Sequence, residues 1–213
     1  MSEAVDPVLM LVLLLNFFVL GTSRIHAAIN AAALQGAVLG LLALLVHGFD
    51  GWLPLTVGCA TVLIKGFAIP AMLRRAMREA SIRREIDPFI DFIPSLLACA
   101  VATGFAVVFA HTLPLAPQHV GSLLVPASLA TVLAGFIVLS TRRKAITQVA
   151  GYLILENGVF IMGLGLLDAI PFLVEAGVLL DLFVAIFVMG IIIYRINQEF
   201  ASLDTARLSS LKE

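Results

Sequence analysis

Long apolar stretches, each about twenty residues, recur along the chain and constrain its fold more than any other feature. A helix rises about 1.5 Å per residue, so about twenty apolar residues cross a hydrocarbon core of about 30 Å. The stretches lie near 5–22, 27–47, 52–73, 89–110, 120–140, 146–167 and 172–194. Charged residues make up only 13% of the 213 residues, about half of their share in soluble proteins. We therefore expect an all-α integral membrane bundle of seven transmembrane helices.

The basic residues predict the orientation of this bundle. In a seven-span arrangement, all thirteen lysines and arginines except Lys65 follow the first, third, fifth or seventh span, on one side of the membrane. The connections on the other side contain acidic residues and histidines but no Lys or Arg. By the positive-inside rule, the N-terminus is predicted outside and the C-terminus in the cytoplasm. The first residues contain no cation, so we expect the first span to be retained rather than removed as a signal peptide.

The predicted spans divide the chain into three parts. Residues 1–112 are predicted to form the first four membrane helices, with a cytoplasmic loop at 74–88. Residues 113–196 form a three-helix unit, and residues 197–213 form a cytoplasmic tail. The polar segment 78–92 is compatible with a short amphipathic helix at the inner surface or with a charged connector.

Four ionisable side chains are predicted at membrane depth, namely Lys65, Glu156, Glu175 and Asp181. A charge at the bilayer centre costs about 2.5–3.5 kcal/mol, so such groups usually face a bundle interior or an ion path. Counted from the cytoplasmic basic residues, Lys65, Glu156 and Asp181 lie roughly 14, 18 and 21 Å deep. Glu175 lies roughly 30 Å deep, near the outer face. We expect Glu156 and Asp181 to meet because a short turn joins their spans.

Polar residues near Glu156 extend this pattern. Gln148, Tyr152 and Glu156 recur at i, i+4 and i+8, so one helix face leads from the cytoplasmic end to the carboxylate. Asn157 adds an amide beside Glu156. The pattern predicts a proton path formed by Glu156, Asp181, Glu175 and Lys65 and supported by Tyr152, Gln148 and Asn157.

A structural role for the same groups stays open. A membrane glutamate can be a hydrogen-bonding group that joins neighbouring helices. Three further amides, Asn16, Asn30 and Gln35, are predicted to serve helix packing in this way.

Other site classes have no support in the sequence. The two cysteines, Cys59 and Cys99, stand alone in separate apolar stretches, so we expect neither a metal site nor an iron–sulfur cluster. No basic run interleaved with aromatic residues suggests nucleic-acid binding. We expect no catalytic centre and no bound cofactor in this chain.

The segment GYLILENGVF at 151–160, preceded by STRRKAITQVA, resembles the second helix of the K subunit of respiratory complex I. The C subunit of multisubunit cation/proton antiporters shares this pattern. The resemblance implies a three-helix unit with two membrane glutamates of a proton channel. Alignment on Asn157 places Leu153 at the family's glutamate position, with Glu156 one turn away. In the third helix Glu175 and Asp181 are alternative matches, and depth favours Asp181.

The whole chain is similar to component E of hydrogenase-4-type membrane-bound nickel–iron hydrogenases. The shared features are IKGFAIPAML around Lys65, GYLILENG, the Glu175–Asp181 spacing and the ending LDTARLSSLKE. This resemblance implies a non-catalytic subunit of a complex I-like assembly in the cytoplasmic (inner) membrane of a bacterium or archaeon. Its expected partners are antiporter-like and quinone-chamber-like membrane subunits and soluble subunits with nickel–iron and iron–sulfur centres.

Three functions are compatible with these features. The first is a hydrogenase subunit of the hydrogenase-4 or formate hydrogenlyase type, whose buried carboxylates contribute to a proton path coupled to redox chemistry. The second is a K- or C-type subunit of a cation/proton antiporter without redox partners. The third is a membrane scaffold whose polar residues only hold helices together. The four additional spans and Lys65 favour the first.

Overall fold

The described chain is helical in the computed structural model, which describes residues 2–47, 58–59, 61–79, 88–113 and 122–166. The helices are α1 (Ser2–Gly21), α2 (Ile25–His47), η1 (Val62–Ala68), α4 (Ile69–Glu79), α5 (Phe92–Thr112), α6 (Leu124–Thr141) and α7 (Ala145–Leu166). The predicted span at 172–194, with Glu175 and Asp181, lies outside the described residues.

Four of these helices are long and apolar enough to cross a bilayer: α2, α5, α6 and α7. A shorter apolar helix, Val5–Gly21, lies within α1. The helices α1, α2, α5, α6 and α7 begin and end within a few residues of the corresponding predicted spans. The prediction of an all-α membrane protein is therefore confirmed for the described part, whereas the count of seven spans and the orientation stay predictions.

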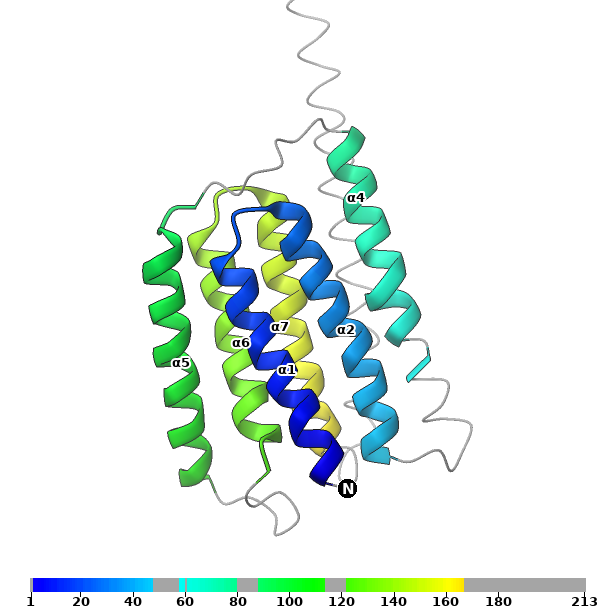
Figure 1. Ribbon diagram of the computed structural model, residues 1–213, viewed down its shortest axis with the longest axis vertical. Helices are drawn as coiled ribbons and strands as arrows, with labels where there is room; N and C mark the ends of the chain where they lie inside the picture. Colours follow the sequence, from blue (N-terminus) through cyan, green and yellow to red (C-terminus); the bar gives the residue numbers. More distant parts are fainter. Residues whose placement is uncertain (1, 48–57, 60, 80–87, 114–121, 167–213) are drawn as a thin grey trace, which may run out of the picture.

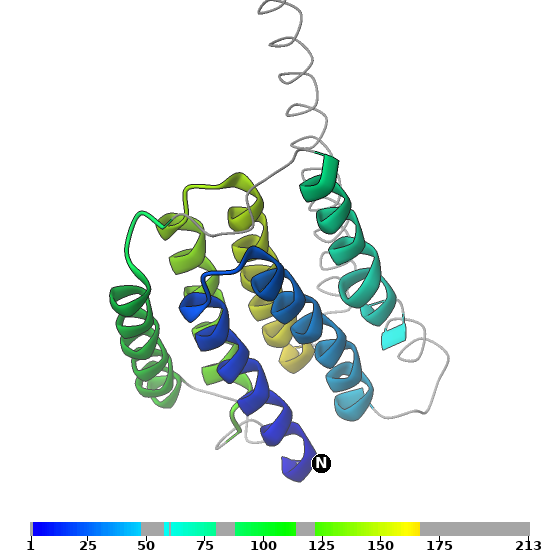
Figure 2. The same ribbon diagram turned by 45° about the horizontal axis from the view of Figure 1, so that its top comes forward.

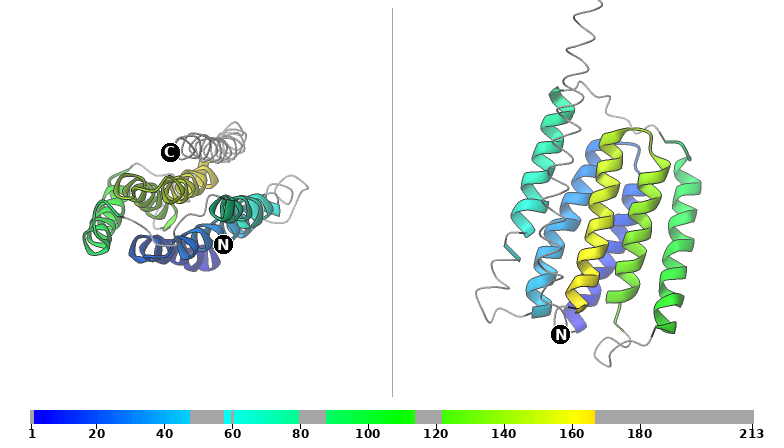
Figure 3. Two further views of the ribbon diagram at one scale, coloured as in Figure 1. Left: turned by 90° about the horizontal axis from the view of Figure 1, so that it is seen from above. Right: turned by 180° about the vertical axis from the view of Figure 1, so that it is seen from behind.

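The helices form two rows that pack face to face. Viewed from above, α1 and α2 form one row and α6 and α7 the other, with α5 and α4 at opposite edges (Figure 3). The same arrangement is visible in Figures 1 and 2, where α4 lies beside α2. The α1–α2 turn, the end of α4 and the α6–α7 turn share one end of the bundle (Figure 1). These segments hold every described Lys and Arg except Lys65, and we call this end the basic end.

The α4 helix continues beyond the predicted apolar span. The sequence predicts a cytoplasmic loop at 74–88, and α4 ends at Glu79 within that segment. The segment RRAMRE consists of residues with high helix propensity, which lets the helix extend beyond the apolar span. Arg74 also contacts α2, because its Nη1 donates a hydrogen bond of 3.1 Å to Asn30 Oδ1.

Two apolar clusters form the core, one above the other along the bundle axis. The cluster toward the basic end combines residues of α1, α2, α4, α5, α6 and α7, including Leu20, Ile29, Leu73 and Ile154. The second cluster, toward the N-terminus of α1, combines residues of α1, α2, α6 and α7. Helices of the predicted N-terminal part and of the predicted three-helix unit therefore share both clusters.

The segment before α4 is a wide π-helical turn, η1. Pro70 at the start of α4 has no N–H and its ring would clash with the carbonyl four residues earlier, so a regular α-helical turn is disfavoured here. Instead, the N–H of Ile69 donates to the carbonyl of Ile64, five residues back. Such π-turns are frequent at functional sites, and this one contains Lys65.

Glycines of α2 let η1 approach closely. A Cβ added at Gly36 would lie 2.6 Å from Cβ of Lys65, and one at Gly40 would lie 2.4 Å from Cγ2 of Val62. This G-x-x-x-G spacing places two backbones in contact, as is common between membrane helices. The close approach of Gly36 determines where the Lys65 side chain begins.

Replacing Gly36 with Ala tests this contact. The new methyl group overlaps Lys65, so we expect the free energy of unfolding in mixed micelles to fall by about 1–3 kcal/mol. The matched control is Gly104→Ala in α5, where an added Cβ meets nothing within 4 Å. Equal stability of the two variants would contradict the close packing of α2 against η1.

Candidate functional site

A buried ion pair joins η1 to α7. Lys65 Nζ lies 2.7 Å from Glu156 Oε1, and both side chains are only 3% exposed. The ring of Phe160, one turn after Glu156 on α7, lies 5.0 Å from the same ammonium nitrogen. The charges are therefore compensated inside the bundle and are shielded from lipid.

Asn157 extends the ion pair toward α2. Its Oδ1 accepts a hydrogen bond of 3.3 Å from Lys65 Nζ, and its Nδ2 donates one of 3.2 Å to Gln35 Oε1. Gln35 Nε2 in turn donates to Asn16 Oδ1 at 2.9 Å and to the Val12 carbonyl at 3.3 Å. The Asn157 and Gln35 amides thus use both their donor and acceptor atoms.

The hydrogen-bonded chain ends on α6. Asn16 Nδ2 donates to Thr131 Oγ1 at 2.9 Å, and the Thr131 hydroxyl donates to the Ala127 carbonyl at 2.7 Å. One continuous polar chain therefore links η1, α7, α2, α1 and α6. We call it the polar layer, and its members are Lys65, Glu156, Asn157, Gln35, Asn16 and Thr131.

The polar layer lies between the two apolar clusters. Its members are all buried, and on α1, α2, α6 and α7 their helix neighbours on the two sides belong to the two different clusters. On α1, for example, Asn16 separates Val12 of one cluster from Val19 of the other. In such an apolar setting an unpaired polar group is costly, so the members of the layer stabilise one another.

One carboxylate oxygen of the ion pair is different. Glu156 Oε2 is buried and has no hydrogen-bond partner among the described residues. A proton added at this oxygen would neutralise the carboxylate and remove the charge that compensates Lys65. Among the described residues nothing occupies Oε2, so it is the atom of the pair that is open to a proton or to a hydrogen-bond donor.

The structure brings some of the predicted site residues together and separates others. Glu156 and Lys65, which are predicted at similar depth, form an ion pair, and Asn157 accepts a hydrogen bond from Lys65. Gln148 instead donates a hydrogen bond of 2.9 Å to the Arg142 carbonyl, and Tyr152 packs against the apolar cluster at the basic end. In the described part, no hydrogen bond connects Gln148 or Tyr152 with Glu156. Asp181 and Glu175 lie outside the described residues.

Arg142, in the α6–α7 turn, contacts α1 and α5 at the basic end. Its guanidinium is buried, donates from Nη2 to the Leu20 carbonyl at 2.7 Å, and lies 4.8 Å from the Phe92 ring. Burial lowers the pKa of the Arg142 side chain from its usual value, but an arginine stays protonated in proteins. The neighbouring Arg143 lies 4.3 Å from the Phe89 ring. The α6–α7 turn thereby holds the end of α1 and the start of α5.

The sequence predicts the amides of the polar layer but not their connection. It predicts Asn16 and Gln35 as helix-packing amides, and both join helices in the structure. Asn30, predicted likewise, joins α2 to α4 through Arg74. Thr131 was not identified, and the sequence offers little to distinguish it from other membrane threonines. The GAVLG segment at 36–40 was the available signal for the close approach of η1.

The chain is 34% identical over 194 residues to uncharacterized protein Rv0085 of Mycobacterium tuberculosis (strain ATCC 25618 / H37Rv). The similarity covers 89% of this chain and 87% of the relative. The chain belongs to the family of that protein. No family model and no solved structure matches it.

Replacing Gln35 with Leu tests the polar layer. The variant leaves Asn16 Oδ1 without its donor and Asn157 Nδ2 without its acceptor, so we expect a loss of about 1–2 kcal/mol in unfolding free energy. The matched control is Asn30→Leu, which removes one exposed hydrogen bond, with Arg74, from the same helix and is expected to change stability by no more than about 0.5 kcal/mol. Detergent-titration unfolding measures both variants. Equal losses would show that the buried amides add nothing beyond an ordinary surface contact.

Proposed function

We propose that this chain is a non-catalytic membrane subunit of a complex I-like hydrogenase, of the hydrogenase-4 or formate hydrogenlyase type. In this proposal Glu156, paired with Lys65, is a proton-carrying group of a translocation path coupled to redox chemistry. The observation that supports it most is the buried 2.7 Å ion pair, with a second carboxylate oxygen that has no partner among the described residues. The resemblance to component E of such hydrogenases adds the context.

The geometry suggests how the pair would couple movement to protonation. A buried charge without a partner is costly. If η1 moves away from α7, the Glu156 carboxylate loses its compensating cation and is neutralised by taking up a proton. When Lys65 returns, its charge favours release of that proton. The π-turn of η1 is the element suited to such a movement, because π-turns within helices are rare and are frequent at functional sites.

The remaining parts of the proposal concern partners and orientation. We place the basic end at the cytoplasmic face of a bacterial or archaeal inner membrane, with the N-terminus outside, because cytoplasmic segments are enriched in Lys and Arg. Antiporter-like and quinone-chamber-like subunits would flank the bundle, and soluble nickel–iron and iron–sulfur subunits would perform the redox chemistry. Asp181 and Glu175 would continue the path beyond Glu156.

A scaffold role is the second candidate, and the polar layer is the observation that favours it. Asn157, Gln35 and Asn16 are amides, which do not exchange protons as carboxylates do, yet they join four helices. In a scaffold, the Lys65–Glu156 pair would only fasten η1 to α7. The two candidates differ in whether the charge of Glu156 is needed once the fold is intact.

A set of charge variants in the intact complex separates the two candidates. Glu156→Gln leaves the buried Lys65 cation without its carboxylate and is expected to lower stability, as the reciprocal variant does. The complex that still assembles should turn over hydrogen but translocate at least tenfold fewer protons, measured with a pH-sensitive dye in proteoliposomes. Lys65→Met alone leaves a buried carboxylate uncompensated and is expected to cost about 3–5 kcal/mol in stability. Combining the two substitutions removes both charges, so stability returns while translocation does not. Asp91→Asn, at an exposed carboxylate before α5, is the matched control.

Full translocation by the stable double variant would eliminate the proton-carrying role and leave the scaffold. The antiporter alternative is tested by the composition of the native complex. Purification through this chain should recover a nickel–iron subunit if the hydrogenase assignment is correct. Recovery of antiporter-like subunits without it would favour a K- or C-type antiporter subunit.

A further inference from the structure

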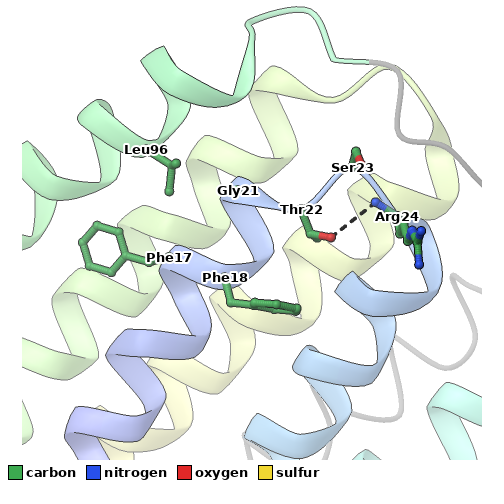
Figure 4. Close-up of a pocket in the computed structure, with 7 residues that line it drawn as sticks. All are labelled: Phe17, Phe18, Gly21, Thr22, Ser23, Arg24 and Leu96. Carbon is green, nitrogen blue, oxygen red and sulfur yellow. Dashed lines mark hydrogen bonds between the residues drawn. The ribbon is translucent and has the colours of Figure 1, made fainter.

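An open hollow lies at the basic end, between α1, α5 and the turn before α2. It is lined by the apolar side chains of Phe17, Phe18 and Leu96, by Thr22, Ser23 and Arg24, and by Gly21. Figure 4 shows Leu96 and Phe17 on the α5 side of Gly21, and Phe18, Thr22 and Arg24 on the side toward α2. We call the three apolar side chains the apolar wall and Thr22, Ser23 and Arg24 the polar wall, and Phe18 is the part of the apolar wall on the same side as Thr22 and Arg24.

The two walls lie at different membrane levels. The apolar helix within α1 ends at Gly21, and the apolar span of α2 begins at Ile25. Thr22, Ser23 and Arg24 consequently occupy the level of the lipid headgroups. Phe17, Phe18 and Leu96 lie about one turn inside the apolar helices, at the level where acyl chains begin.

The polar wall presents donors for an anion. Arg24 is exposed, and its guanidinium has no ion-pair partner within the described part of the chain. Thr22 Oγ1 accepts a hydrogen bond of 3.3 Å from the Arg24 N–H, so the Thr22 hydroxyl proton is available to another acceptor. Ser23 adds an exposed hydroxyl. A guanidinium next to two hydroxyls matches the oxygens of a phosphate group.

The apolar wall determines the source of that phosphate. Free inorganic phosphate would make no favourable contact with the apolar surfaces of Phe17, Phe18 and Leu96. The Phe18 side chain is 52% exposed beside the polar wall. A phospholipid offers both parts, with a phosphate at headgroup level and an acyl chain directly below it. A Cβ added at Gly21 would meet the Leu96 side chain at 3.4 Å, so a larger side chain at this position would fill the hollow.

We propose that this hollow binds an anionic phospholipid, with the headgroup phosphate on Arg24, Thr22 and Ser23 and one acyl chain along Phe17, Phe18 and Leu96. Basic pockets between membrane helices are a recurrent means of anionic lipid recognition. The lipid would cover the interface between α1 and α5, next to the Leu20 carbonyl that accepts a hydrogen bond from Arg142. The site would exist whether or not Glu156 carries protons.

Native mass spectrometry of the delipidated full chain tests the proposal by titration with phosphatidylglycerol, phosphatidylcholine and, separately, inorganic phosphate. We expect one phosphatidylglycerol to be retained more tightly than phosphatidylcholine. Arg24→Gln should weaken its binding about tenfold through loss of a charge-assisted contact. Gly21→Leu should weaken it to a similar extent by filling the hollow while the charge is retained. Arg78→Gln, which removes an exposed cation of α4 at the same end, is the matched control and should change binding less than twofold.

Three results would overturn the proposal. Unchanged phosphatidylglycerol binding by both Arg24→Gln and Gly21→Leu would show that the hollow is not the site. Equal losses in Arg24→Gln and Arg78→Gln would show diffuse attraction to the basic end rather than a defined site. Displacement of phosphatidylglycerol by inorganic phosphate at comparable concentration would show that the acyl chain contributes nothing.

Discussion

Two opposite charges in the interior of an apolar bundle impose the organisation of the described fold. Lys65 and Glu156 each need a partner at this depth, and they meet at 2.7 Å between η1 and α7. Asn157 donates a hydrogen bond to Gln35, Gln35 donates one to Asn16 of α1, and Asn16 donates one to Thr131 of α6. The apolar side chains are consequently divided into two clusters, one on each side of the polar layer.

Backbone geometry makes this meeting possible. Pro70 disfavours a regular helical turn before α4, and the wider η1 turn includes Lys65. Gly36 and Gly40 remove side-chain bulk from α2 at the point where η1 approaches. A residue with a long side chain can then lie in the bundle interior rather than extend toward the surface. The two proposed roles of this pair, proton transfer and helix attachment, differ in whether the Glu156 charge is needed.

The sequence predicted the helices well because bilayer thickness fixes the length of an apolar span, and α1, α2, α5, α6 and α7 lie close to the predicted ranges. Depth counting also placed Lys65 near Glu156, since helical rise is nearly constant. Depth counting does not predict which side chains contact one another, because those contacts also depend on how each helix is rotated about its axis. Gln148 and Tyr152 share a helix face with Glu156, yet Gln148 bonds the α6–α7 turn. The chain through Gln35 and Asn16 required knowing which helices are neighbours, and apolar periodicity alone does not provide this.

The most direct test of the account is the distance between Lys65 and Glu156 in a bilayer. Solid-state NMR dipolar recoupling on protein labelled with ¹⁵Nζ-lysine and ¹³Cδ-glutamate, in lipid vesicles, measures this contact. The account predicts strong dephasing of a glutamate carboxyl signal, matching the 2.7 Å pair, that disappears in Lys65→Met. Dephasing that is absent, or that is unchanged in Lys65→Met, would contradict the ion pair on which the polar layer and the proposed proton chemistry both depend.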